Sequence, residues 1–146
     1  MGLARNAILV LGLAFISRLL ITTLSRKKYP VHQEGGVIVS GASRGIGLQL
    51  VQDIADQTNF IVYAVYRKKK DADLLNGLGK KNLVPVQLDV TNDESVEKAA
   101  AFARGDLKKR GLNLIGLVYN DGMAKRGPHE QLPLEDVIFI FDVNFF

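Results

Sequence analysis

The chain has 146 residues, 47% hydrophobic and 23% charged with four prolines, which is typical of a globular domain and unlike a disordered or low-complexity protein. It has no cysteine and only two histidines, His32 and His129, which excludes disulfide frameworks, thiolate metal sites and histidine-rich zinc chemistry; we predict no metal site. The net charge of +4 originates in residues 1–33, which hold five basic residues and no acid, leaving 14 basic and 15 acidic residues beyond them. The main body therefore lacks the basic surface of a nucleic-acid-binding protein, and we expect no nucleic-acid partner.

An apolar segment lies near the start of the sequence. Residues 7–16 are an unbroken apolar run, Arg18 interrupts it, and residues 19–24 resume it. As a helix, residues 7–24 would rise about 27 Å, close to the hydrocarbon thickness of a bilayer. The cost of placing the charge of Arg18 in the membrane leaves the free energy of insertion only slightly favourable. We interpret residues 1–28 as a hydrophobic membrane anchor, with a cleaved signal or a transit peptide as the alternative.

The charges after this segment bear on its orientation. Arg26, Lys27 and Lys28 follow it directly, which favours a cytoplasmic position for the rest of the chain. We predict anchoring in the endoplasmic reticulum or another internal membrane, with the following domain facing the cytoplasm; targeting into an organelle is the alternative. Residues 29–35, which include Pro30, are interpreted as a linker.

Strand-like and helix-like segments alternate after residue 35. Apolar, β-branched runs predict strands at 36–40, 60–66, 83–88 and 112–119. Helices are predicted after residue 47, within 67–79, from a capping box at 91–94 to about 110, and from Pro133 onward, with a loop at 120–131. This alternation predicts an α/β fold with a doubly wound parallel sheet, in which ligands bind at the carboxyl ends of the strands.

A glycine-rich turn joins the first predicted strand to the helix after it. Gly41, Gly45 and Gly47 have the spacing G-x-x-x-G-x-G. Residues without a Cβ let the backbone approach a pyrophosphate, and the N–H groups at the start of the helix attract the anion. We predict a dinucleotide site here; an ordinary strand–helix turn is the competing interpretation.

This turn resembles the first motif of the short-chain dehydrogenase/reductase family, T-G-x-x-x-G-x-G, with a serine in place of the threonine. The resemblance implies a Rossmann NAD(P)-binding fold over residues 36–146 in which the cofactor contacts Ser40, Gly41, Ser43, Arg44, Gly45, Ile46 and Gly47. The family's second motif, D-V, appears as Asp89 and Val90, and the resemblance implies that the carboxylate meets the adenine amino group. A turn residue at a strand end is the alternative for Asp89.

The third motif, N-N-A-G, is only partly kept. Asn120 and Gly122 match it as cofactor-binding residues, whereas Tyr119 and Asp121 do not. Asp121 replaces a small apolar residue near the expected cofactor, and its like charge would weaken binding. The fourth motif, V-N, appears at residues 143–144. The resemblance implies that Asn144 belongs to the catalytic tetrad and holds a water in a proton relay; a buried hydrogen-bonding residue is the alternative.

The end of the second predicted strand distinguishes the two nicotinamide cofactors. In this family an acid there would bind the ribose 2′-hydroxyl of NAD, and a base would meet the 2′-phosphate of NADP. Here Arg67 follows the strand, and Arg44 lies in the glycine turn. We therefore predict NADP rather than NAD, with a solvated run of charges as the competing interpretation.

The resemblance implies an NADP-dependent oxidoreductase that moves hydride between nicotinamide and a small-molecule carbonyl or alcohol. The family's catalytic serine and Y-x-x-x-K motif would follow residue 146, so we expect an incomplete Rossmann domain without dehydrogenase activity of its own. The alternatives are a catalytically inactive dinucleotide-binding fragment and a membrane-tethered interaction module.

The last predicted helix is apolar nearly all round. Eight of residues 137–146 are apolar, and only Asp142 and Asn144 interrupt them. Such a helix is expected to be buried on two sides. In the family it packs on the sheet and against a partner subunit, so we predict a homo-oligomer formed through this helix and an aggregation-prone fragment.

Overall fold

A computed structural model describes residues 16–18 and 31–145. The chain divides into two compact units, Met1–Val31 and His32–Phe146. In the first unit, residues 16–18 are helical, and the rest of the predicted apolar anchor lies outside the described residues. Of the helices formed within the described ranges, none has the length and hydropathy needed to span a bilayer.

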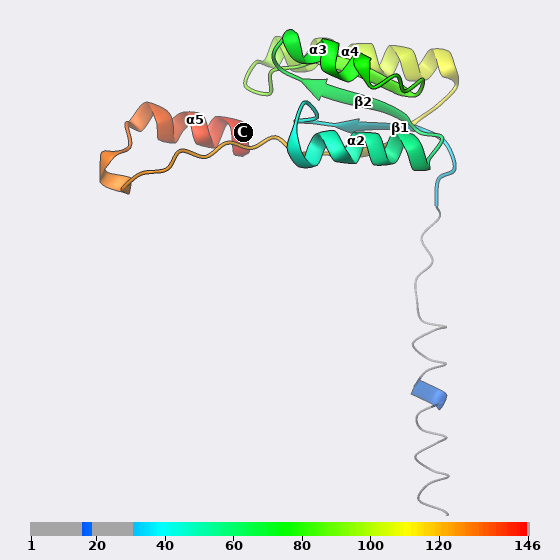
Figure 1. The fold of residues 1–146 in the computed structure, drawn as a ribbon, viewed down its shortest axis with the longest axis horizontal. Coiled ribbons are helices and arrows are strands. Elements are labelled where there is room, and N and C mark those ends of the chain that lie inside the picture. The colour runs from blue at the N-terminus through cyan, green and yellow to red at the C-terminus, as the bar shows by residue number, and fades with distance from the viewer. Residues whose placement is uncertain (1–15, 19–30, 146) are drawn as a thin grey trace, which may run out of the picture. The chain divides into compact units, whose positions relative to one another are not determined.

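The second unit is built on a four-stranded parallel sheet (Figure 1). Its strands are β1 (Gly36–Val39), β2 (Ile61–Tyr66), β3 (Leu83–Gln87) and β4 (Leu114–Val118), in the order β3-β2-β1-β4. Each strand lies within its predicted range and is one to three residues shorter. The predicted parallel α/β sheet is therefore confirmed.

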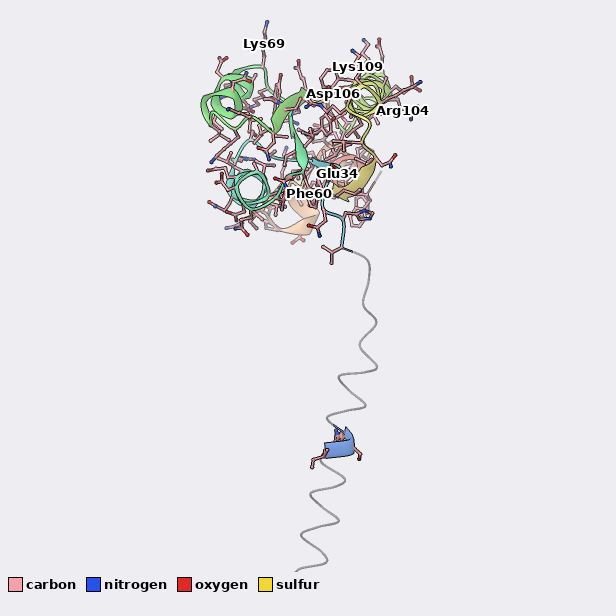
Figure 2. All side chains as sticks on the ribbon, turned by 90° about the vertical axis from the view of Figure 1, so that its right-hand side faces the viewer. Glu34, Phe60, Lys69, Arg104, Asp106 and Lys109 are labelled. Carbon is pink, nitrogen blue, oxygen red and sulfur yellow. The ribbon has the colours of Figure 1, made fainter. Side chains whose placement is uncertain are left out.

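Helices cover both faces of the sheet, as the view along them in Figure 2 shows. The helices are α2 (Gly45–Gln57), α3 (Lys70–Gly77), α4 (Asp93–Arg110) and α5 (Leu134–Asn144), with a 3₁₀ turn at His129–Gln131. Alternate residues of β2 point to opposite faces, as the pleat requires. Val62 and Ala64 belong to the core cluster that includes Val51 of α2, whereas Tyr63 packs in the cluster of α4.

The start of α4 differs from its prediction. The N-cap is Asn92, whose side chain accepts a hydrogen bond from the backbone N–H of Ser95 at 2.9 Å. Thr91 instead donates its hydroxyl to Asp89. The predicted capping box at 91–94 is therefore wrong, because the threonine hydroxyl is already engaged by the residue at the end of β3.

A polar network that runs from buried Tyr63 to exposed Arg110 fastens α4 to β2. The Tyr63 side chain is fully buried, and its hydroxyl donates to Asp106 Oδ2 at 2.9 Å. Arg110 Nε donates to the same oxygen at 2.8 Å. Burial and the bond to Asp106 raise the pKa of Tyr63, while Arg110 holds the pKa of Asp106 below its usual value. Figure 2 shows Asp106 on the side of α4 that faces the strands.

The last helix, α5, is placed differently from the prediction. It folds back along the segment that precedes it (Figure 1). An ion pair between Lys125 of that segment and Asp136 of α5 holds the two together. No residue of α5 is buried, and Ile138 and Phe141 are 52% and 47% exposed. The expectation that α5 is buried against the sheet is therefore wrong for the described chain. Its polar contacts bind it to residues 123–125 instead.

Candidate dinucleotide-binding site

The strand order creates a crevice between β1 and β4. The chain runs outward from β1 through β2 to β3 and then returns to the other side of β1 to form β4. In doubly wound sheets ligands bind at such a reversal of strand order, at the carboxyl ends of the strands, and this place is called the crevice below. The glycine turn follows β1 at this edge, and residues 119–122 follow β4.

Backbone conformation and close packing explain why glycine recurs in this turn. Gly41 and Gly45 have φ of +61° and +56°, a left-handed conformation that residues with a Cβ rarely adopt. A Cβ on Gly47 would lie 2.3 Å from the carbonyl oxygen of Gly41 and 2.5 Å from Asn120 Nδ2. Only glycine at position 47 lets α2 begin this close to the turn.

The start of α2 has the features of an anion site. Its N-cap residue, Arg44, is extended, no side chain caps the helix, and the first turn contains no acidic residue. The first N–H groups of a helix have no partner within the helix, and its dipole favours negative charge there. Ser43 is half-buried and Ile46 is 79% exposed beside these groups. A pyrophosphate fits this arrangement.

Ser40 and Asn120 join the two sides of the crevice. The buried Ser40 hydroxyl oxygen accepts the backbone N–H of Asn120 at 3.0 Å and that of Asp121 at 3.3 Å. In return, Asn120 Nδ2 donates to the carbonyl oxygen of Gly41 at 3.2 Å. Both side chains predicted to bind cofactor thus hold the glycine turn against the end of β4.

The two arginines predicted to select the cofactor flank one backbone contact. The N–H of Ala42 donates to the carbonyl oxygen of Val65 at 2.9 Å, which joins the glycine turn to the end of β2. Arg44 and Arg67 each follow one of these partners by two residues, and both are exposed. Two positive charges therefore stand at the same edge of the sheet.

Asp89 lies at the end of β3, next along the same edge. Its Oδ1 accepts the hydroxyl of Thr91 at 2.7 Å and the backbone N–H of Thr91 at 3.0 Å. These bonds, with a smaller contribution from the charge of Arg67, lower the pKa of Asp89. The prediction that Thr91 belongs to a helix cap missed these bonds. An aspartate side chain often accepts a hydrogen bond from the backbone two residues further on, which was the available signal. Val90 is half-buried beside it.

Asp121 was predicted only as a source of repulsion. Its side-chain Oδ2 is buried and has no hydrogen-bond partner among the residues that the structure describes. Buried polar atoms are normally paired, so this oxygen is an exception within the described chain. The one signal in the sequence was the charge at a position where the family motif has a small apolar residue.

Asn144 lies at the end of α5, in contact with the segment after β4. Its Oδ1 accepts the N–H of Met123 at 3.0 Å, and its Nδ2 donates to the carbonyl oxygen of Met123 at 2.9 Å. A Cβ on Gly122 would lie 3.6 Å from the same Oδ1. Asn144 therefore holds α5 near the crevice edge through residues 122–123.

A separate hollow of about 360 Å³ lies between α4 and the start of β4, lined in part by Ile38, Leu107 and Leu112. It belongs to the α4 face of the sheet and contains no residue of the glycine turn. It lies apart from the candidate dinucleotide site.

Comparisons with known proteins agree with this geometry. The short chain dehydrogenase family matches residues 36–146. Human retinol dehydrogenase 8 is 37% identical over 117 residues, which cover 75% of this chain and 35% of that protein. The NADPH-bound carbonyl reductase from chicken fatty liver superposes with a TM-score of 0.69 at 35% identity, covering 78% of this chain and 44% of that one. For the closed form of serine dehydrogenase complexed with NADP⁺, the TM-score is 0.66 at 29% identity, covering 75% of this chain and 43% of that one.

The chain spans about a third of the length of the curated relatives it matches and less than half of these solved structures. The match nevertheless includes the whole parallel sheet, the glycine turn and the segment after β4. The chain therefore belongs to the short chain dehydrogenase family, an oxidoreductase family, and residues 36–146 carry its Rossmann-like fold.

Proposed function

We propose that this chain forms the cofactor-binding part of an NADP-dependent oxidoreductase that transfers hydride to or from a small carbonyl or alcohol substrate. The observation that carries the proposal is the start of α2, where Gly47 packs against Gly41 and no side chain caps the first N–H groups of the helix. The bound nicotinamide supplies the hydride acceptor or donor.

Each candidate residue then has a distinct task. The N–H groups at the glycine turn bind the pyrophosphate, and Asp89, kept ionised by Thr91, accepts a hydrogen bond from the adenine amino group. Ser40 and Asn120 hold the turn and the end of β4 in position. Asn144 holds the segment after β4 in place by its two hydrogen bonds to Met123. We propose that it also serves the family's proton relay in the assembled site.

Several observations support NADP over NAD. Arg44 and Arg67 flank the contact between the glycine turn and β2, and the end of β2 has no acid. A guanidinium group matches a phosphate better than it matches a ribose hydroxyl. The chicken carbonyl reductase is bound to NADPH and serine dehydrogenase to NADP⁺.

The domain organisation and location belong to the same proposal. Residues 36–146 form part of an NAD(P)-binding domain, residues 29–35 a linker, and residues 1–28 an anchor or targeting segment. We place the protein on an internal membrane with the Rossmann-like part facing the cytoplasm, an orientation that the basic residues after the apolar segment favour.

The test is a titration of the chain with NADPH and NADH, followed by fluorescence. We expect NADPH to bind at least ten-fold more tightly, and Arg44→Ala or Arg67→Ala to reduce this preference with little effect on NADH. Arg104→Ala, which removes an exposed arginine on α4, is the control and leaves the preference unchanged. Equal affinities of the wild-type chain for the two cofactors would show that the assignment to NADP is wrong.

One observation favours a second candidate function, a membrane-tethered interaction module without cofactor. Asp121 places a carboxylate beside the crevice, and a cofactor's phosphates would be repelled there. The same titration separates the two functions, because an interaction module binds neither NADPH nor NADH.

A further inference from the structure

Asp121 holds an unusual position at the crevice. Its backbone N–H is fixed by the Ser40 hydroxyl oxygen at 3.3 Å, so the residue lies directly at the junction of β1 and β4. Its Oδ2 is buried and unpartnered within the described part of the chain. Asp121 therefore places a negative charge at the end of β4, beside the glycine turn that Ser40 begins.

The order of the strands shows which part of a dinucleotide reaches Asp121; this step rests on the proposed function. Arg67 and Asp89 follow β2 and β3, on one side of β1, and accommodate the adenosine half. The pyrophosphate lies at the start of α2, directly after β1. Because β4 is on the opposite side of β1, the nicotinamide half extends toward β4 and Asp121.

We propose that Asp121 selects the redox state of the cofactor, favouring oxidised NADP⁺ over reduced NADPH. The oxidised nicotinamide ring carries a positive charge and the reduced ring is neutral, so only the oxidised ring is attracted to the carboxylate. Repulsion between Asp121 and the pyrophosphate is present with both forms and cancels in the ratio of their affinities.

The size of the effect follows from Coulomb's law. We take the ring and the carboxylate to lie two strand spacings apart, which separates their charges by about 10 Å. At an effective dielectric constant between those of a protein surface and water, a charge at this distance changes a binding constant about five-fold. Tighter binding of the oxidised form also makes the bound reduced cofactor a stronger hydride donor.

The test compares dissociation constants of NADP⁺ and NADPH, measured by calorimetry at pH 7, for the full chain and two variants. Asp121→Asn removes the charge and keeps the shape of the side chain. Asp73→Asn removes an exposed carboxylate from α3 and is the matched control. We expect the NADPH-to-NADP⁺ ratio of dissociation constants to fall about five-fold in Asp121→Asn and to stay unchanged in Asp73→Asn.

Two outcomes would overturn the proposal, and they differ from each other. If Asp121→Asn strengthens binding of both forms equally, the charge acts on the pyrophosphate alone and the redox selectivity is refuted. If neither form binds to the wild-type chain or to the variants, the proposed function itself fails, and the role of Asp121 fails with it.

Discussion

The candidate site depends on contacts between single residues that leave no space for substitution. Gly47 is the clearest case, because the space that a side chain would occupy is filled by the backbone of Gly41 and the amide of Asn120. Both neighbours are themselves held, Asn120 by its bond to Gly41 and by the Ser40 hydroxyl. A change at position 47 therefore moves the start of α2, where the anion would bind.

We expect Gly47→Ala to destabilise the folded chain by about 1–3 kcal/mol, the usual range for overpacking, and to abolish cofactor binding. Urea denaturation and NADPH titration measure the two effects. Gly105→Ala is the control, since this glycine lies inside α4 and a Cβ there meets no atom within 4 Å among the described residues. It is expected to stabilise the chain by about 0.5–1 kcal/mol. A neutral Gly47→Ala would contradict the packing seen here.

At the scale of elements, α4 is fastened to the sheet by more than apolar contacts. The fully buried Tyr63 of β2 reaches Asp106, which also accepts a bond from Arg110. The raised pKa of Tyr63 means that the folded chain keeps its proton at pH values where the unfolded chain loses it. The stabilising effect of this proton is complete below the unfolded pKa of about 10 and is lost as pH rises above it.

Above pH 10, we therefore expect the free energy of unfolding to fall by about 1.4 kcal/mol per pH unit through Tyr63. Tyr63→Phe removes this slope, and near pH 7 it costs about 0.5–1.5 kcal/mol for the lost hydrogen bond. Urea denaturation at pH 7, 9 and above 10 measures both. Tyr119→Phe, which alters a 78% exposed tyrosine, is expected to keep the wild-type slope. The same slope in Tyr63→Phe would show that another group causes it.

At the scale of the whole molecule, apolar surface lies on two elements near the end of the chain. Leu114 and Leu117 of β4 are about half exposed, and β4 is an edge of the described sheet. The α5 helix exposes Ile138, Phe139 and Phe141 and has no buried residue. Each large apolar side chain that is buried contributes about 1.5–3 kcal/mol, so we expect two copies to associate through α5.

We expect residues 34–146 to elute from size-exclusion chromatography as dimers or larger species. The double variant Ile138→Lys, Phe141→Lys places charges on the exposed helix and is expected to elute as a monomer. Leu74→Lys, a similar change at a 45% exposed leucine of α3, should leave the association unchanged. A wild-type fragment that elutes as a monomer would refute self-association through α5.

Much of the fold and of the site could be predicted from the sequence because it depends on local properties. Apolar runs predicted the four strands, and apolar periodicity predicted α2. The later helices were predicted from end signals such as Pro133 and from the order of elements along the chain. The spacing of Gly41, Gly45 and Gly47 predicted the turn, because positive φ and a close backbone approach require glycine whatever surrounds it. The motifs of the family then gave Asp89, Asn120 and Asn144 as candidate site residues, and their roles toward a cofactor stay predictions.

Other features depend on residues far apart in the chain, and only the tertiary structure determined them. Ser40 meets Asn120 across 80 residues, and Tyr63 meets Asp106 across 43, pairings that no local pattern encodes. Thr91 serves Asp89 instead of capping α4, since two possible partners compete for one hydroxyl. The position of α5 followed from its ties to Met123 and Lys125, because an apolar pattern requires burial but does not specify against which surface.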